Sequence, residues 1–177
     1  MIITPSPLTN DLSALAPDQI LKLAKRFVAN PEFKSAGRPL RVALLAGFLT
    51  DFLVNTLCLM LARRGFAVEL WRGDYGVMAP AILDPSSDLH VFGPDLVFLL
   101  PTHRDLRCAP GFGTDGEAAA RNEASFWAGL WEKLACPVVQ LSFDPPPARP
   151  LGELDGIIAG GLLDHVRLSN RTLAQAA

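Results

Sequence analysis

Short apolar runs separated by polar segments follow one another along this chain, and their lengths predict its secondary structure. The runs at residues 40–46, 66–71 and 95–100 are short, apolar and partly β-branched, which is typical of strands buried on both faces of a parallel sheet. Residues 51–64 are apolar at almost every position, which is too long for one strand and indicates a largely buried helix. Residues 40–71 therefore form one β-α-β unit, whose right-handed crossover requires a parallel α/β sheet.

The rest of the chain extends this pattern. We expect helices over about residues 17–30, 116–134 and 162–176, short helices near 79–83 and 87–92, a fourth strand at 137–143, and room for a fifth near 156–159. These elements predict a flavodoxin-like, three-layer α/β/α fold with a parallel sheet in the order 2-1-3-4-(5). We divide the chain into an N-terminal extension with its helix, residues 1–37, and an α/β domain, residues 38–177.

Composition and charge exclude several classes of function. The 177 residues are 50% apolar and carry a formal net charge of −2, with acidic and basic residues spread along the chain, so no nucleic-acid partner is expected. The apolar runs are far shorter than the roughly 20 residues that cross a bilayer, and the N-terminus lacks the pattern of a signal peptide. We therefore expect a cytoplasmic protein with no membrane partner.

Neither a metal nor a nucleotide cofactor is expected. The cysteines Cys58, Cys108 and Cys136 are odd in number and form no Cys-x-x-Cys pair, and the three histidines are far apart in the sequence. The segment Gly111-Phe-Gly-Thr-Asp-Gly116 matches the dinucleotide fingerprint, but it begins well after the preceding strand instead of directly at its end.

Polar residues gather where the predicted strands end. Since ligands bind at the carboxyl ends of the strands in such sheets, a binding site is expected there, built from Gly47, Asp74, Tyr75, Thr102, Arg104 and Asp144. Thr50, His103 and Asp105 supply the minimum for a nucleophile, a base and a residue that orients the base. The structural alternative is that Thr50 caps a helix, Asp74 and Asp144 form turns, and Arg104 pairs with an acid.

Several ordered motifs resemble the N-terminal domain of FkbH-like proteins over residues 38–175. They are Ala46-Gly-Phe-Leu-Thr50, Gly73-Asp-Tyr-Gly76, Leu83-Asp-Pro-Ser-Ser-Asp-Leu89, Pro94-Asp-Leu-Val97, Pro150-Leu-Gly-Glu153 and Val166-Arg-Leu-Ser-Asn170. The resemblance implies a fold of the SGNH/GDSL-hydrolase type that precedes a haloacid-dehalogenase-type (HAD) phosphatase domain. It also implies a role in moving a glyceryl unit from a phosphorylated three-carbon donor onto an acyl carrier protein, for polyketide and related pathways.

The chain departs from the active members of these families. It has no Asp-x-Asp-x-Thr sequence, which HAD chemistry requires, and it has Gly47-Phe-Leu49 where SGNH esterases have Gly-Asp-Ser. The segment Pro101-Thr-His-Arg-Asp105 lacks the asparagine of the SGNH oxyanion block, and Asp164-His165 replaces a spaced Asp-x-x-His.

We therefore expect an accessory, non-catalytic domain that acts with a HAD-type partner and an acyl carrier protein. The alternatives are a small-molecule esterase or acyltransferase that uses Thr50 and His103 with Asp105 or Asp74, and a module that binds a small anion near Arg104.

Overall fold

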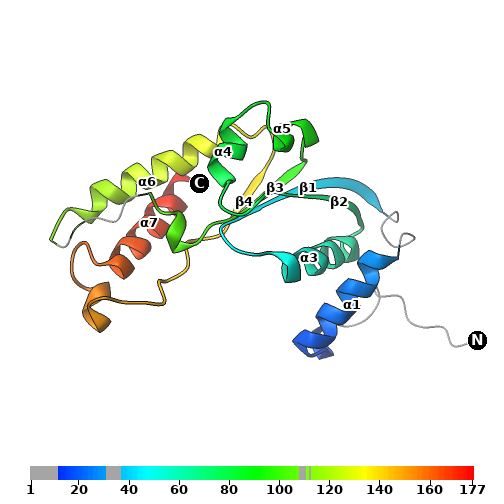
Figure 1. Cartoon of the computed structure of the whole chain (residues 1–177), viewed down its shortest axis with the longest axis horizontal. Helices are drawn as coiled ribbons and strands as arrows, with labels where there is room; N and C mark the ends of the chain where they lie inside the picture. Colours follow the sequence, from blue (N-terminus) through cyan, green and yellow to red (C-terminus); the bar gives the residue numbers. More distant parts are fainter. Residues whose placement is uncertain (1–11, 31–36, 108–110, 112) are drawn as a thin grey trace, which may run out of the picture.

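A computed structural model describes residues 12–30, 37–107, 111 and 113–177 (Figure 1). Its centre is a sheet of four parallel strands in the order β2-β1-β3-β4. The strands are β1 (Arg38–Ala46), β2 (Phe66–Arg72), β3 (Leu96–Leu100) and β4 (Val138–Gln140). The predicted parallel sheet and the predicted order of its first four strands are confirmed.

One face of the sheet is covered by α3 (Asp51–Arg63), which packs on Leu44, Ala46 and Leu100. The helix α1 (Pro17–Ala29) packs on the outer side of α3, where Phe27 is buried. Figure 1 shows both helices on the same side of the strands.

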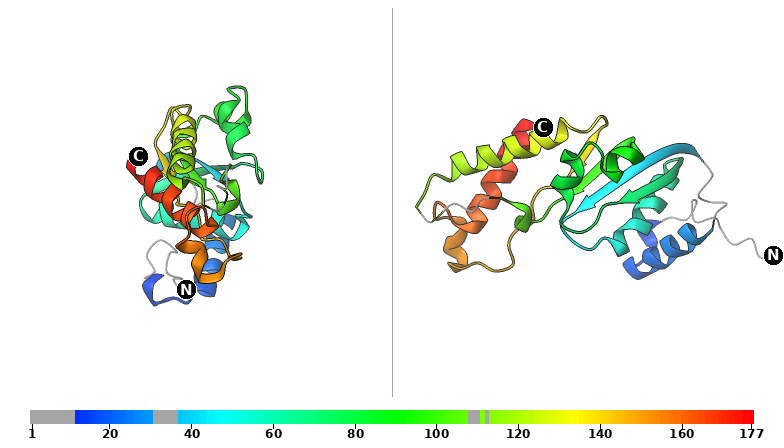
Figure 2. Two further views of the ribbon diagram at one scale, coloured as in Figure 1. Left: turned by 90° about the vertical axis from the view of Figure 1, so that its left-hand side faces the viewer. Right: turned by 45° about the horizontal axis from the view of Figure 1, so that its top comes forward.

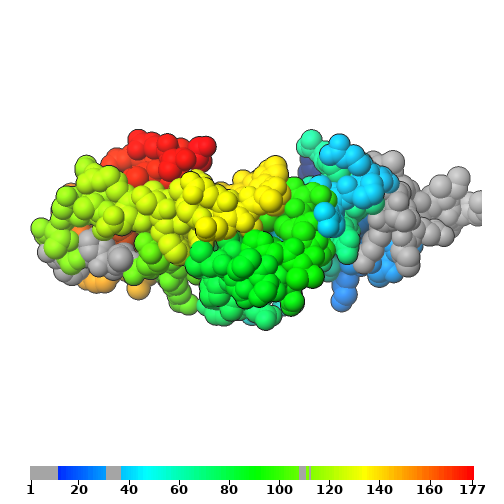
Figure 3. Space-filling view, turned by 90° about the horizontal axis from the view of Figure 1, so that it is seen from above, coloured from blue at the N-terminus to red at the C-terminus, as the bar shows by residue number. Residues whose placement is uncertain are grey.

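The opposite face is covered by α4 (Met78–Leu83), α5 (Asp88–Phe92), α6 (Gly116–Trp131) and α7 (Leu162–Ala176). Their apolar side chains form the main core with the strands, and Trp127 of α6 is its largest fully buried side chain. The two views of Figure 2 show this three-layer arrangement from other sides, and the space-filling view of Figure 3 shows α6 and α7 extending beyond the sheet at one end of the molecule. The expected flavodoxin-like, three-layer fold is confirmed.

In the described part of the chain, short 3-10 helices lie before α1 as η1 (Leu12–Ala14), after β3 as η2 (His103–Asp105) and before α7 as η3 (Gly152–Gly156). The fifth strand that the sequence allows near residues 156–159 does not form, because the chain there leaves η3 in turns that lead to α7. Among the described residues, no helix has both the length and the apolar character needed to cross a membrane.

The fourth strand is shorter than predicted. The side chain of Asn170 in α7 accepts a hydrogen bond from the Phe143 backbone N–H at 2.8 Å and donates one to the Phe143 carbonyl at 2.9 Å. The strand β4 ends at Gln140, the Leu141 backbone N–H still donates to the Leu99 carbonyl of β3 at 2.9 Å, and by Phe143 the backbone groups bond α7 instead of the sheet.

Candidate functional site

Because the four strands are parallel, their carboxyl ends meet at one edge of the sheet, and two neighbouring hollows open there. The first, called here the His103 pocket, has a volume of about 310 Å³ and is lined by Gly47, Phe48, Tyr75, Thr102, His103, Arg104, Asp144, Pro145 and Pro147. The second, called the Thr50 pocket, has a volume of about 180 Å³ and is lined by Ala46, Phe48, Leu49, Thr50, Asp51, Arg72, Gly73, Asp74 and Tyr75. Together the two pockets are lined by every residue that the sequence proposed for a site except Asp105.

His103 and Asp144 form a hydrogen-bonded pair, although they are 41 positions apart in the sequence. The imidazole Nδ1 lies 3.1 Å from Asp144 Oδ1, and the His103 backbone N–H donates to the same oxygen at 2.6 Å. The His103 side chain is 14% exposed, whereas that of Asp144 is 52% exposed. Partial burial is the largest single influence and acts to raise the pKa of Asp144. The backbone and side-chain hydrogen bonds from His103, the charge attraction to its ring and a backbone hydrogen bond of Asp144 itself together outweigh burial, so this pKa lies below its ordinary value.

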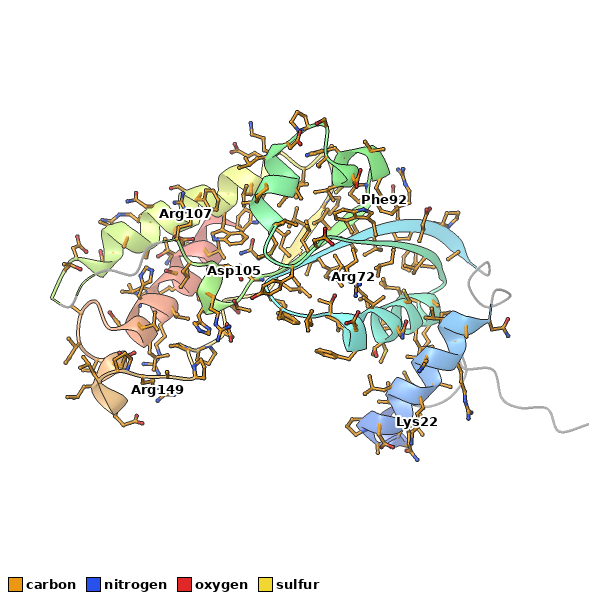
Figure 4. All side chains as sticks on the ribbon, viewed as in Figure 1. Lys22, Arg72, Phe92, Asp105, Arg107 and Arg149 are labelled. Carbon is orange, nitrogen blue, oxygen red and sulfur yellow. The ribbon has the colours of Figure 1, made fainter. Side chains whose placement is uncertain are left out.

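Asp105 does not orient His103. Its Oδ2 accepts hydrogen bonds from the Thr102 backbone N–H at 2.7 Å and from the Thr102 hydroxyl at 2.9 Å. The same carboxylate packs against Gly47, where a Cβ atom would collide with Oδ2. Figure 4 labels Asp105 near the end of the sheet, where it fastens η2 to the residue that follows β1.

Thr50 is separated from His103. It is 4% exposed, it lines the Thr50 pocket, and its hydroxyl makes no capping hydrogen bond although the residue stands at the N-cap of α3. Its backbone carbonyl accepts bonds from Leu53 and Val54 in the first turn of the helix. Among the described residues, no hydrogen bond connects Thr50 to His103, Asp105 or Asp74.

Two aromatic residues lie between the two pockets. Phe48 and Tyr75 line both of them, and Tyr75 is 61% exposed. On the far rim of the Thr50 pocket, Arg72 pairs with Asp51, and Asp74 lies exposed beside them. Figure 4 labels Arg72 on this side.

Arg104 does not pair with an acid, in contrast to the structural alternative. Its guanidinium is exposed at the His103 pocket and forms no ion pair with any residue that the structure describes. The backbone N–H of Arg104 donates to the Thr102 hydroxyl at 3.3 Å, which completes the capped turn of η2. The His103 pocket therefore presents a cation that no described acidic side chain pairs with.

Three lining residues, Phe48, Pro145 and Pro147, were not proposed from the sequence. They are apolar residues of loops, and such residues carry no chemical signature. The proline-rich run that follows Asp144 is the one signal available, because prolines there exclude a helix and force the chain to form an irregular wall.

The described residues contain no group of three or more His, Cys, Asp or Glu side chains that could hold a metal ion. His90 makes a ring hydrogen bond at 2.8 Å to the Ile82 carbonyl, and His165 is buried in α7. Cys136 is half-buried and burial raises the pKa of its thiol, whereas Cys108 and part of the Gly111–Gly116 segment lie outside the described residues.

The comparisons with known proteins find one fold relative. No family model and no curated protein sequence matches the chain. Among solved structures, the fold is similar to the crystal structure of the N-terminal part of the protein BF1531 from Bacteroides fragilis, which contains a phosphatase domain and is complexed with Mg. The TM-score is 0.73 at 20% sequence identity, and the match covers 88% of this chain but only 41% of that one. The chain thus has the fold of part of a larger, phosphatase-containing protein.

Proposed function

We propose that this chain is an accessory domain of the FkbH-like type, which acts with a HAD-type phosphatase or transferase domain. Its role is to help load a glyceryl-type three-carbon unit onto an acyl carrier protein, by receiving the carrier-bound unit at the strand-end edge. The observation that carries the proposal is the match of almost the whole chain to a portion of a protein that also contains a phosphatase domain. The sequence resemblance to the N-terminal domain of FkbH-like proteins supports the same pairing.

The residues of this chain suit an accessory role, because they do not form a complete active site. An Asp-x-Asp-x-Thr sequence for phosphoryl chemistry is absent from the sequence, so that chemistry belongs to the partner domain, in the same polypeptide or in another. The position of the SGNH serine is occupied within Gly47-Phe-Leu49, which offers no side-chain hydroxyl. The His103 pocket has donors and apolar walls that suit binding, and its hydroxyl groups are not arranged as nucleophiles.

The experiment is a reconstituted loading reaction with a HAD-type partner, an acyl carrier protein and a phosphorylated three-carbon donor, run with and without this chain. We expect the chain to increase the rate of carrier loading or to tighten the apparent affinity for the carrier. Equal rates and equal affinities in both reactions would contradict the proposal.

The His103–Asp144 pair favours a second candidate, an esterase or acyltransferase of the SGNH type with an atypical site. This candidate predicts that the chain alone hydrolyses short acyl esters and loses that activity in Thr50→Ala and His103→Ala. The separation of Thr50 and His103 into two pockets argues against a direct proton transfer between them. Absence of turnover on acetyl and butyryl esters would remove this candidate.

A further inference from the structure

We propose that His103, oriented by Asp144, is a general base that removes a proton from a hydroxyl or thiol of the bound ligand, so that the nucleophile of the site belongs to the ligand and not to the protein. This inference rests on the proposed function and adds the chemistry of the same pocket. It is carried by three features of the described residues: the orientation of the imidazole, the absence of an available protein nucleophile, and the lining of the pocket.

The orientation of the imidazole leaves one nitrogen for chemistry. An ionised carboxylate only accepts hydrogen bonds, so the bond to Asp144 places a proton on Nδ1 of His103. In the neutral ring Nε2 then carries a lone pair, and Nε2 makes no hydrogen bond with any described residue. The backbone bond from His103 to the same carboxylate fixes the ring and its partner as one unit.

Among the residues that the structure describes, no hydroxyl forms a hydrogen bond with His103 Nε2. Thr50 lines the other pocket, and the Thr102 hydroxyl, which does line the His103 pocket, gives its only proton to Asp105 at 2.9 Å. The phenol of Tyr75 forms no hydrogen bond with His103. Within the described part of the chain, the proton that reaches Nε2 is therefore expected to come from a ligand or from water.

The lining of the pocket favours a ligand over water alone. Phe48, Pro145 and Pro147 provide apolar walls that can cover a carbon chain, and the pocket volume of about 310 Å³ admits a small molecule or the end of a flexible arm. The unpaired guanidinium of Arg104 at the same pocket attracts a ligand that carries a phosphate or a carboxylate. A hydroxyl or thiol close to an anionic group is the chemical class that fits these contacts.

The step balances as an acyl transfer. The ligand O–H or S–H gives its proton to His103 Nε2, and the oxygen or sulfur forms a bond to the carbonyl carbon of an ester or thioester that the HAD-type partner holds. The bond from that carbon to the leaving oxygen or sulfur breaks, and the leaving atom takes the proton back from Nε2. Asp144 is a positioning residue, because it stabilises the imidazolium that forms transiently without touching the ligand.

The test uses the complete loading system with His103→Gln and Asp144→Asn in this chain, and measures single-turnover acyl transfer and carrier affinity separately. General base catalysis contributes about 10²–10⁴-fold. We therefore expect His103→Gln to slow transfer by at least about 100-fold, to abolish the acidic limb of the pH–rate profile, and to change carrier affinity far less than it changes the rate. Asp144→Asn, which keeps the imidazole, should lose a smaller factor.

The matched control is His90→Gln, which changes a histidine whose ring bonds the Ile82 carbonyl outside both pockets and should leave transfer unchanged. Thermal unfolding of each variant shows whether the substitution has disrupted the fold. If His103→Gln is disrupted, the transfer rate of Asp144→Asn tests the inference in its place. Loading that responds to the chain but not to His103→Gln or Asp144→Asn overturns this inference alone. Loading that does not respond to the chain at all overturns the proposed function and this inference together.

Discussion

At the scale of single residues, Gly47 determines how the loop after β3 packs against the end of β1. The Asp105 carboxylate fills the space that a side chain at position 47 would need, and Thr102 holds that carboxylate with two hydrogen bonds. Because the carboxylate cannot move without losing these bonds, glycine is required here for lack of space and not for backbone freedom.

Gly47→Ala should lower the free energy of unfolding by about 1–3 kcal/mol, because the added methyl group displaces a held carboxylate. Urea unfolding measures this loss. Gly129→Ala is the matched control, since a Cβ there meets no atom within 4 Å in the last turn of α6, so the substitution should not destabilise the fold and should stabilise the helix by at most about 1 kcal/mol. Equal effects of the two substitutions would contradict the packing described for Gly47.

The pair of His103 and Asp144 makes a second prediction, about pH. The pKa of Asp144 is lower in the folded chain than in the unfolded chain, so its ionised form stabilises the fold above the ordinary value of 3.8. This contribution disappears as the pH falls through the lower, folded pKa.

In an NMR titration of the side-chain carboxyl carbons, Asp144 should titrate below its ordinary pKa, and His103→Ala should move that pKa upward. The pKa of Asp144 should not rise all the way to its ordinary value, because the backbone N–H at position 103 still donates to the carboxylate. Asp84 is the internal control: the side chain and backbone N–H of Ser86 lower its pKa, and it should not respond. An Asp144 midpoint that is the same with and without the imidazole would show that the ring bond is absent in solution.

At the scale of elements, α6 anchors the segment that follows η2. The Glu123 carboxylate of α6 is 1% exposed, accepts a hydrogen bond from Trp127 Nε1 at 3.0 Å, and accepts another from the Arg107 backbone N–H at 3.3 Å. The guanidinium of Arg107 lies 3.8 Å from the centre of the Phe126 ring. These contacts hold the chain two residues beyond the turn that carries His103.

Glu123→Ala should cost about 2 kcal/mol, because it leaves the buried Trp127 N–H without an acceptor. Glu117→Ala on the same helix is the control, since that exposed carboxylate pairs only with Arg121 and should change stability by less than about 1 kcal/mol. Chemical denaturation of both variants makes the comparison, and a cost for Glu123→Ala as small as that for Glu117→Ala would refute the anchoring role.

The elements that local patterns define were predictable from the sequence. The β-α-β unit follows from the lengths of its apolar runs, and α6 follows from its aromatic stripe with Trp127 at the centre. The apolar pattern did not show where β4 ends, nor that the backbone groups of Phe143 bond Asn170, 27 positions away, instead of a neighbouring strand. No fifth strand forms at residues 156–159, where the chain runs in turns from η3 to α7, and Asp155 of η3 accepts a hydrogen bond from the Leu163 backbone N–H.

The same limit applies to the site. The topology rule brought His103, Asp144, Arg104 and Tyr75 to one edge without any knowledge of their contacts. It could not choose which aspartate bonds His103, because Asp74, Asp105 and Asp144 all follow strands. Which aspartate bonds His103 depends on the conformations of the loops after the strands. The apolar pattern of the strands carries no information about those conformations.

At the scale of the whole molecule, α1 belongs to the same packed body as the sheet, although we assigned it to an N-terminal extension. Phe27 and Ala24 are buried against Leu59 and Ala62 of α3, and α3 itself covers the sheet. The contact joins the extension to the α/β domain through one shared apolar layer.

Phe27→Ala should lower the free energy of unfolding by about 3–5 kcal/mol and keep a single transition, because its cavity lies in a layer shared with the domain. Leu21→Ala in the same helix changes a side chain that is 44% exposed and should cost much less. Separate unfolding transitions for the helix and the sheet, detected by circular dichroism and tryptophan fluorescence, would contradict a shared layer.

The most direct test of the central claim is an NMR titration of the isotopically labelled chain with an acyl carrier protein that bears a three-carbon acyl unit. The account predicts that the largest shift changes fall at the strand-end edge, on Gly47, Tyr75, Thr102, His103 and Arg104. A titration without shift changes, or with changes confined to the opposite ends of the strands near Arg38 and Phe66, would contradict it.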